Sequence, residues 1–240
     1  MSRAVFLDRD GVINATLWNS TEEKWDSPYT LEDFQLLPGT AQAIRSMNEL
    51  GYLTVVISNQ PGVAKGKCSP QFLDALDRKM LLDLAQEDAR LDAIYYCLHH
   101  PDAQVESLRV ACGCRKPKPD LLLRAARDFQ IDLESSYFIG DQGVDVEAGL
   151  AAGCRTVLVQ GSAIPLRGSP GPGGPGTNGQ NGQRPKPPLS GQARPHLVAE
   201  SLLMAVSTLF AEEGHPPDPY ARSAGGHSQD REEKRHADIP

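Results

Sequence analysis

Two carboxylates near the N-terminus, Asp8 and Asp10, come directly after the apolar run Ala4–Leu7. Side chains two positions apart project to the same side of an extended chain, so this pair can share a hard cation while one member does covalent chemistry. Gly11 then lets the backbone turn away. Because Asp and Gly also dominate ordinary turns, the triplet alone leaves a structural interpretation open.

A second polar group, Ser58, Asn59 and Gln60, follows another apolar run and precedes a Pro-Gly turn. Hydroxyl and backbone N–H groups at such a position can hold phosphate oxygens, although a plain polar loop has the same composition. In a parallel sheet, this strand ends at the same edge as the strand before Asp8, where α/β sheets bind ligands. The position therefore favours a phosphoryl-positioning role.

Two further segments bring charge to the same edge. Asp141 ends an apolar run, and Asp145 follows it at helical spacing, which supplies carboxylates for a magnesium ion. Arg115 and Lys116 precede a proline-rich stretch that restricts the backbone. In an acidic chain, such a stiffened basic run indicates an anion site more than solvated surface charge.

Four soft ligands are spaced as in a metal site: Cys97, His99, Cys112 and Cys114. Thiolates and imidazole suit zinc, and four protein ligands fill its tetrahedral coordination, so we predict a structural Zn²⁺ site. A redox pair formed by Cys112 and Cys114 is the alternative. His100 is then an outer-shell or surface residue.

Short apolar runs alternate with amphipathic helical patterns, which is typical of a parallel sheet covered by helices. One helix is predicted after Thr40 as N-cap and closed by Gly51, one over 70–89, and one over 120–129. The pattern predicts an α/β fold with a doubly wound, mostly parallel, Rossmann-like sheet. Its predicted strands are Ala4–Leu7, Leu53–Ser58, Ala93–Cys97, Ser136–Gly140 and Thr156–Val159.

The composition changes sharply along the chain. We predict a catalytic core over 1–161 with a zinc loop at 97–114, and a Gly/Pro-rich flexible insertion over 162–195. A C-terminal helix over 196–213 is expected to pack on the core. The residues from 214 to 240 are predicted to form a disordered tail.

Charge and hydropathy exclude several classes of protein. The chain has 240 residues and a net charge of −7, which argues against a nucleic-acid partner. No segment has the length of a membrane span, and no signal pattern precedes the first strand, so we expect a cytoplasmic protein without a membrane partner. An odd number of cysteines, five, does not indicate a disulfide framework. We expect a monomer.

The motifs occur in an order that resembles the haloacid dehalogenase-like (HAD) superfamily. Asp-Arg-Asp-Gly-Val-Ile-Asn, Ser-Asn-Gln-Pro-Gly-Val-Ala-Lys-Gly, the Cys/His pairs and Cys-Arg-Lys-Pro-Lys-Pro are similar to its zinc-containing D-glycero-D-manno-heptose 1,7-bisphosphate 7-phosphatases. The resemblance extends from Ala4 to about Gly161. It implies a HAD core with a zinc-stabilised loop and no large cap domain.

The resemblance also implies a role for each motif. Asp8 would be the nucleophile that forms an aspartyl-phosphate, and Asp10 the general acid and base. Mg²⁺ would be held by the Asp8 carboxylate, the Asp10 backbone carbonyl and Asp141. Ser58 and Lys116 would stabilise the transferring phosphoryl group.

The implied substrate is a phosphorylated sugar that loses its 7-phosphate and makes contacts with Asn59, Gln60 and Arg115. The chain departs from the family pattern in a longer segment over 15–29 and at Gln142, which replaces a lysine and removes one expected anion contact. Histidinol-phosphate phosphatase is the alternative within the superfamily. A phosphate-binding protein without turnover is an alternative from another class, and a mutase would normally need a larger cap.

Overall fold

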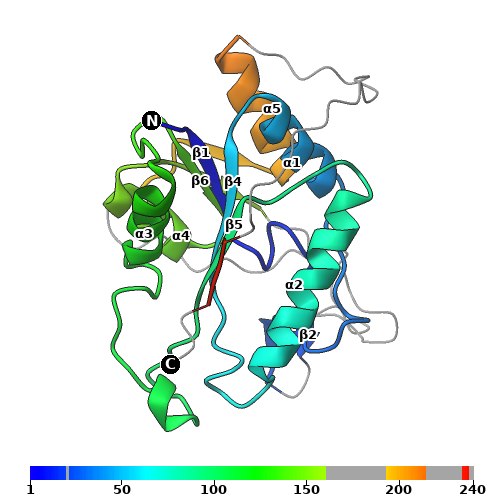
Figure 1. The fold of residues 1–240 in the computed structure, drawn as a ribbon, viewed down its shortest axis with the longest axis vertical. Helices are drawn as coiled ribbons and strands as arrows, with labels where there is room; N and C mark the ends of the chain where they lie inside the picture. The colour runs from blue at the N-terminus through cyan, green and yellow to red at the C-terminus, as the bar shows by residue number, and fades with distance from the viewer. Residues whose placement is uncertain (20–21, 161–192, 215–233, 238–240) are drawn as a thin grey trace, which may run out of the picture.

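A parallel β-sheet forms the centre of the protein, seen in a computed structural model that describes residues 1–19, 22–160, 193–214 and 234–237 (Figure 1). The strand order is β8-β7-β6-β1-β4-β5-β9, and every neighbouring pair is parallel. The strands of the sheet are β1 Ala4–Leu7, β4 Leu53–Asn59, β5 Ala93–Cys97, β6 Tyr137–Gly140, β7 Arg155–Val159, β8 Leu197–Ala199 and β9 Lys234–Ala237. The predicted fold class and the five predicted strands are confirmed, with ends shifted by at most one residue.

Helices cover both faces of the sheet (Figure 1). The helices α1 Thr40–Glu49, α2 Pro70–Ala85 and α5 Leu202–Glu212 pack on one face, and α3 Asp120–Phe129 and α4 Gly143–Ala152 pack on the other. Side chains alternate along β1, so that Val5 and Leu7 enter the first core cluster and Ala4 and Phe6 the second. Burial on both faces explains why the strands are apolar without interruption.

Helix ends differ from the predicted ones. Thr40 is the first residue of α1, and Gly39 occupies the N-cap with a positive φ of 77°. The helix predicted over 70–89 ends at Ala85, because Asp88 adopts a left-handed conformation and the Ala89 N–H turns back to the Leu84 carbonyl. Polar and charged side chains at 86–88 thus form a turn instead of continuing the apolar stripe.

The C-terminal segment predicted as one helix forms a strand followed by a helix. Leu197–Ala199 pair with β7, and α5 begins after Ser201, whose Oγ accepts a hydrogen bond from the Met204 N–H. The α5 helix packs on the core through Phe210, whose ring stacks on Tyr52 at 5.3 Å.

Parts of the predicted insertion and tail lie outside the described residues. From the insertion over 162–195, only 193–195 are described, and from the tail over 214–240 only 214 and 234–237. The segment 234–237 is the strand β9 beside β5, where a tail without structure was predicted. Without β9, the strand β5 would be at the edge of the sheet and would offer unpaired backbone groups to a passing segment, which sequence composition does not reveal.

A small hairpin was not predicted. Strands β2 Leu17–Asn19 and β3 Lys24–Asp26 pair antiparallel, with Trp18 opposite Trp25. Three residues per strand are too few for an alternation pattern to stand out. Within the described part of the chain, no helix is both long and apolar enough to cross a membrane.

Candidate active site

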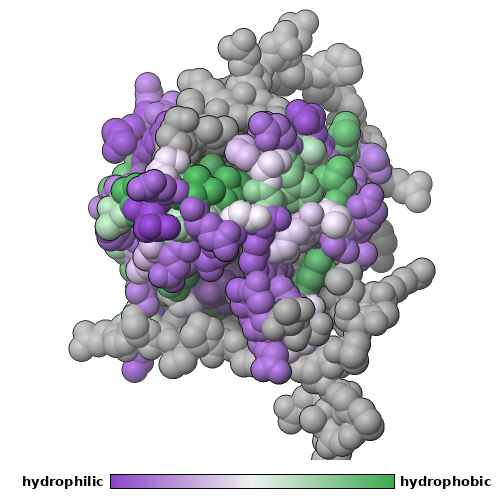
Figure 2. All heavy atoms as spheres, turned by 90° about the horizontal axis from the view of Figure 1, so that it is seen from below, coloured by the Kyte–Doolittle hydropathy of each residue, from purple (hydrophilic) through white to green (hydrophobic). Residues whose placement is uncertain are grey.

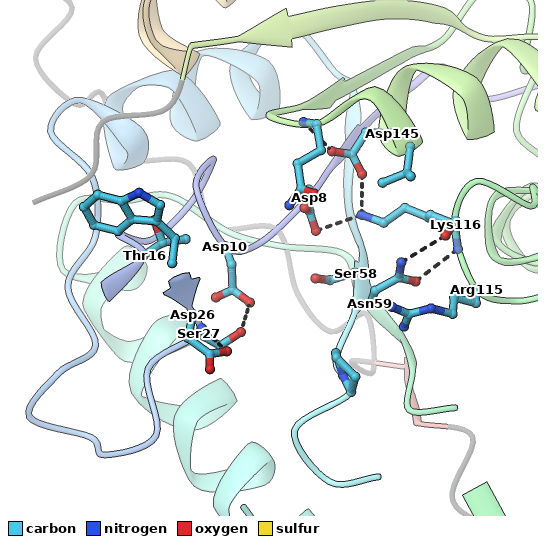
Figure 3. Close-up of a pocket in the computed structure, with 14 residues that line it drawn as sticks. Asp8, Asp10, Thr16, Asp26, Ser27, Ser58, Asn59, Arg115, Lys116 and Asp145 are labelled. Atoms are coloured by element: carbon cyan, nitrogen blue, oxygen red, sulfur yellow. Dashed lines mark hydrogen bonds and ion pairs between the residues drawn. The ribbon is translucent and has the colours of Figure 1, made fainter. Parts of the chain in front are cut away.

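A pocket of about 250 Å³ lies at the carboxyl ends of the central strands (Figure 3). Asp8 follows β1, Ser58 is the second-last residue of β4, Lys116 comes from the loop before α3, and Asp145 lies in the first turn of α4. Strand ends in a parallel sheet meet at one edge, which explains why residues so far apart in sequence line one pocket.

Figure 2 shows the molecule from below, where hydrophilic side chains surround a band of hydrophobic ones.

Lys116 is the buried cation of the pocket. Its Nζ lies 2.9 Å from Asp8 Oδ1 and 2.7 Å from Asp145 Oδ1, and it also donates to the Ile57 carbonyl. Burial lowers the pKa of Lys116, but the two carboxylates outweigh burial and raise it, which keeps the amine charged. Burial raises the pKa of Asp8 above its ordinary value, and the charge of Lys116 offsets part of that shift. The ion pair therefore favours the anionic form of Asp8 that a nucleophile requires.

Asp145 holds Lys116 in place and also caps a helix. One carboxylate oxygen pairs with Lys116, and the other accepts a hydrogen bond from the Gln142 N–H at the start of α4. This capping fixes the side chain on the helix N-terminus. Sequence spacing had suggested Asp145 only as a magnesium ligand.

Asp10 points into a network of hydrogen-bond donors on the other side of the pocket. Its carboxylate accepts hydrogen bonds from Asn14, Ser27 and Gln60 at 2.8–2.9 Å, and Arg9 forms an ion pair with it at 3.1 Å. Burial would raise the pKa of Asp10, but Arg9 and the three donors outweigh burial and lower it. The Arg9 side chain is itself fully buried and bonds to the Tyr96 hydroxyl.

The polar residues after β4 have different surroundings. Asn59 exchanges two hydrogen bonds with the backbone of Lys116 and lines the pocket. The Gln60 amide donates to Asp10 and Ser58 and accepts from Arg9, so its polar groups are engaged within the protein. The predicted substrate contact of Gln60 stays a prediction, and the observed bonds give it a positioning role.

The residues present fit a magnesium ion. Carboxylate oxygens of Asp8, Asp141 and Asp145 lie within 4.8 Å of one another, and all three residues are buried. Three buried carboxylates against the single ammonium of Lys116 leave an excess of negative charge, which a divalent hard cation would offset. Gly11 has a φ of 90°, and a Cβ there would lie 2.5 Å from Asp141 Oδ2, so only glycine keeps the space beside that carboxylate open.

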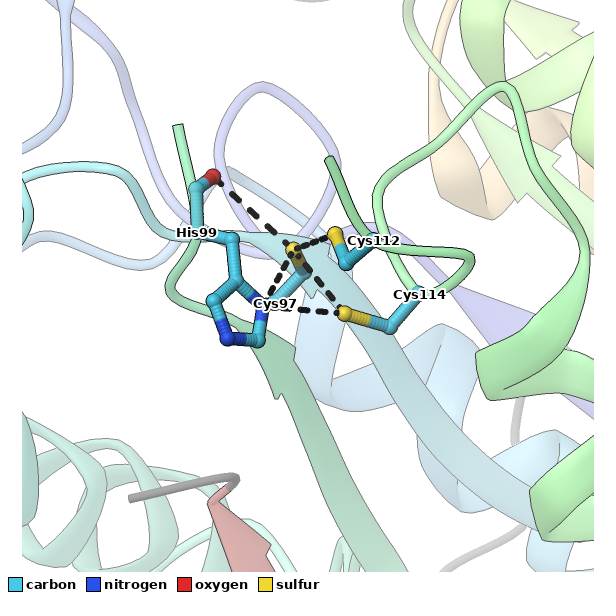
Figure 4. A group of neighbouring side chains, drawn as sticks. All are labelled: Cys97, His99, Cys112 and Cys114. Carbon is cyan, nitrogen blue, oxygen red and sulfur yellow. Dashed lines mark hydrogen bonds between the residues drawn. The ribbon is translucent and has the colours of Figure 1, made fainter. Parts of the chain in front are cut away.

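The four predicted soft ligands converge in one cluster (Figure 4). Cys97 Sγ lies 3.6 Å from Cys112 Sγ and 3.3 Å from Cys114 Sγ, and His99 Nδ1 lies 3.3 Å from Cys114 Sγ. Such separations are far longer than a disulfide bond and are near the edge of a tetrahedron with Zn–S bonds of about 2.3 Å. The donor set therefore fits zinc.

The loop that follows Cys114 joins the Cys/His cluster to the pocket. Lys118 Nζ donates to the Cys112 carbonyl, and the Arg115 guanidinium donates to the His99 carbonyl. Gly113 packs against Asp120, where a Cβ would lie 1.8 Å from a carboxylate oxygen. This tight loop fixes where Lys116 leaves the backbone.

Sequence reasoning missed the residues that the hairpin region brings to the pocket. Thr16, Trp25, Asp26 and Ser27 all line it. Their only sequence signal was the extra length of the segment 15–29 with its two tryptophans, which did not show where that segment lies.

Comparisons with known proteins agree with this geometry. A family model described as HAD-hydrolase-like matches residues 113–164. The D-glycero-beta-D-manno-heptose-1,7-bisphosphate 7-phosphatase of Escherichia coli (strain K12) is 40% identical over 160 residues, which cover 65% of this chain and 78% of that enzyme. The protein of the same name from Rhodopseudomonas palustris is 40% identical over 163 residues, which cover 67% and 85%. This chain belongs to their family of HAD-like phosphatases.

Solved structures support the family assignment. The D,D-heptose 1,7-bisphosphate phosphatase from B. bronchiseptica, complexed with magnesium and phosphate, superposes with a TM-score of 0.64 at 30% identity and covers 88% of this chain and 99% of its own. The D,D-heptose 1,7-bisphosphate phosphatase from Burkholderia thailandensis has a TM-score of 0.54 at 23% identity, covers 88% of this chain and 99% of its own, and shows the shared fold. The resemblance stated from the sequence motifs is thereby confirmed.

Proposed function

We propose that this HAD-like phosphatase is magnesium-dependent and removes the 7-phosphate of D-glycero-D-manno-heptose 1,7-bisphosphate, leaving the heptose 1-phosphate. The observation that carries the mechanism is the convergence of Asp8, Lys116 and Ser58 in one pocket beside a buried group of carboxylates. The relatives that share 40% identity carry this activity in their names.

Two steps follow from the placement of Asp8 and Asp10. A carboxylate oxygen of Asp8 forms a bond to phosphorus while the bond between phosphorus and the sugar oxygen breaks, and Asp10 gives that oxygen its proton. Asp10 then takes a proton from water, whose oxygen attacks phosphorus, releases inorganic phosphate and restores Asp8. The donors around Asp10 favour its anion, which is the form that accepts a proton in the second step.

Other residues would hold the phosphoryl group. The Lys116 ammonium and the Ser58 hydroxyl line the pocket beside Asp8, where they can donate to phosphoryl oxygens. Asp8, the Asp10 backbone carbonyl and Asp141 would hold Mg²⁺. When bound, this ion would offset the repulsion between the anionic nucleophile and the anionic phosphate.

A group of cations favours a substrate with a second phosphate. Burial lowers the pKa of Lys65, and the charges of Lys24 and Arg115 lower it further. Burial and the charges of Lys65 and Arg115 likewise lower the pKa of His100. Of these groups, Arg115 lines the pocket, and its charge is one cause of both pKa shifts. A second phosphate of the substrate would be attracted by the Arg115 guanidinium, whereas the ammonium group of histidinol phosphate would be repelled by it.

The test is phosphate release with Mg²⁺ from both anomers of the heptose bisphosphate, histidinol phosphate and fructose 1,6-bisphosphate. We expect the highest kcat/KM for a heptose bisphosphate. A higher kcat/KM for histidinol phosphate would contradict the proposed substrate and would still agree with a phosphatase reaction. Binding of all four compounds without phosphate release would contradict the proposed phosphatase activity and would favour a phosphate-binding protein.

A further inference from the structure

The β2–β3 hairpin places an aromatic residue with an unsatisfied polar group in the wall of the pocket. Trp25 is 9% exposed and lines the same pocket as Asp8 and Asp10. Its indole Nε1 is buried and has no hydrogen-bond partner in the described part of the chain. A buried donor without an acceptor is costly, so such a group in a binding pocket calls for an acceptor that arrives from outside.

The hairpin is fixed to the catalytic edge at two places. Ser27 Oγ donates to Asp10 at 2.8 Å. Asp26 accepts hydrogen bonds from Lys67 Nζ at 2.6 Å and from the Tyr29 hydroxyl at 2.8 Å, and Lys67 also pairs with Glu22. Lys67 belongs to the loop that follows β4, so the hairpin is tied to the same sheet edge that carries Ser58. A wall held in this way can present Trp25 at a defined position.

The other polar groups of the hairpin near the pocket have partners. The Asp26 carboxylate and the Ser27 hydroxyl are engaged as described, which leaves the Trp25 N–H as the group with unmet hydrogen-bonding capacity among these three. Trp18 faces Trp25 across the hairpin with their rings edge to face at 5.5 Å. This contact supports the indole from the side and limits its rotation.

We propose that Trp25 is a specificity-determining residue that donates its indole N–H to a hydroxyl group of the sugar. Sugars combine hydroxyl acceptors with apolar C–H surface, and an indole offers a donor and an apolar ring in one rigid side chain. The hairpin thus takes the place of a cap domain as the substrate-recognising wall. This inference rests on the proposed function, because it assigns the sugar part of the same substrate.

The test compares sugar substrates with acetyl phosphate, a small phosphate that has neither ring nor hydroxyl. Trp25→Phe keeps an aromatic ring and loses the N–H, and Trp18→Phe is the matched control on the facing strand. We expect Trp25→Phe to lower kcat/KM for the heptose bisphosphate by about 5- to 10-fold, which is the loss of one ordinary hydrogen bond, and to leave acetyl phosphate turnover unchanged. Trp18→Phe keeps an aromatic ring against Trp25, so it should leave both unchanged.

Equal losses on both substrates, or no loss on either, would overturn the role of Trp25. Trp25→Leu, which also lacks a side-chain donor, serves as a second variant if Trp25→Phe lowers the thermal midpoint, and it should show the same split between the two substrates. The wild-type protein separates the two proposals: if it cleaves acetyl phosphate and no sugar phosphate, the proposed function fails whatever the variants do.

Discussion

Replacement of Lys116 by Met should destabilise the protein, because Lys116 is the cation that pairs with two buried carboxylates. The Lys116 side chain is 2% exposed, and its Nζ lies 2.9 Å from Asp8 and 2.7 Å from Asp145. Met has a similar length and no charge, so the variant keeps most of the packing and leaves two buried carboxylates without their cation. Removing one partner of a buried ion pair costs about 3–5 kcal/mol, so we expect the free energy of unfolding of the protein without Mg²⁺ to fall by about that amount.

Lys118→Met is the matched control. Lys118 belongs to the same loop, but it is exposed and its Nζ donates only one described bond, to the Cys112 carbonyl. Its loss should change the unfolding free energy by about 1 kcal/mol or less. The difference between the unfolding free energies of the two variants therefore measures the effect of the buried charge, separate from general effects of changing a lysine in this loop.

The assay is urea unfolding in buffer without Mg²⁺ and in buffer with Mg²⁺, both without chelator, with zinc content measured on each protein to verify that the Cys/His cluster is intact. Lys116→Met should also lower kcat by about 100-fold or more, because a preorganised donor to the phosphoryl group is lost. If Lys116→Met and Lys118→Met lose the same stability, the reasoning from buried charge is refuted. Retained kcat would refute the role of Lys116 in catalysis.

Three further predictions concern separate parts of the molecule. Asp8→Asn should abolish turnover while the far-ultraviolet circular dichroism and thermal midpoint stay close to those of the wild type, and substantial residual activity would exclude Asp8 as nucleophile. Protein purified without chelator should contain close to one zinc per chain, and Cys114→Ser should lose that zinc and unfold at lower temperature, whereas Cys154→Ser, outside the cluster, should retain the metal. Burial raises the pKa of Glu213, but hydrogen bonds from Tyr52 and Tyr137 outweigh burial and lower it. A lowered pKa contributes stability above the unfolded pKa of about 4.3 that is lost on acidification, so Glu213→Gln should destabilise the protein by about 1 kcal/mol at pH 7 and by little at pH 3. Glu212→Gln, which changes an exposed neighbour, should show no such difference, and a pH-independent loss in Glu213→Gln would contradict the assignment.

Much of the core could be predicted because its signals are local. The five central strands are apolar runs, and burial of both faces of a parallel sheet is what makes them apolar throughout. Asp8 and Asp141 could be recognised because each directly follows such a run. The four soft ligands could be recognised because Cys and His at short spacing are rare outside metal sites, and the structure brings all four together.

Element ends and the segment at 15–29 could not be predicted in the same way. Nothing local distinguishes Thr40 at the first helical position from Thr40 at the N-cap, because the difference lies in the positive φ of Gly39. The strand β8 is set by its pairing with β7, across the long segment that separates them in the chain. The hairpin strands have three residues each, and their position over the pocket follows from the bonds of Lys67 and Asp10.

The sequence by itself determined which chemical groups are present: two carboxylates after the first strand, a basic loop, and soft and hard side chains suited to two kinds of metal. Only the tertiary structure decided how these groups are paired. Asn59 and Lys116 are 57 positions apart and exchange two hydrogen bonds, and Asp145 pairs with Lys116 instead of acting only beside Asp141. Local sequence carries residue type and spacing, whereas the partner of a buried charge depends on which strand ends the sheet brings together.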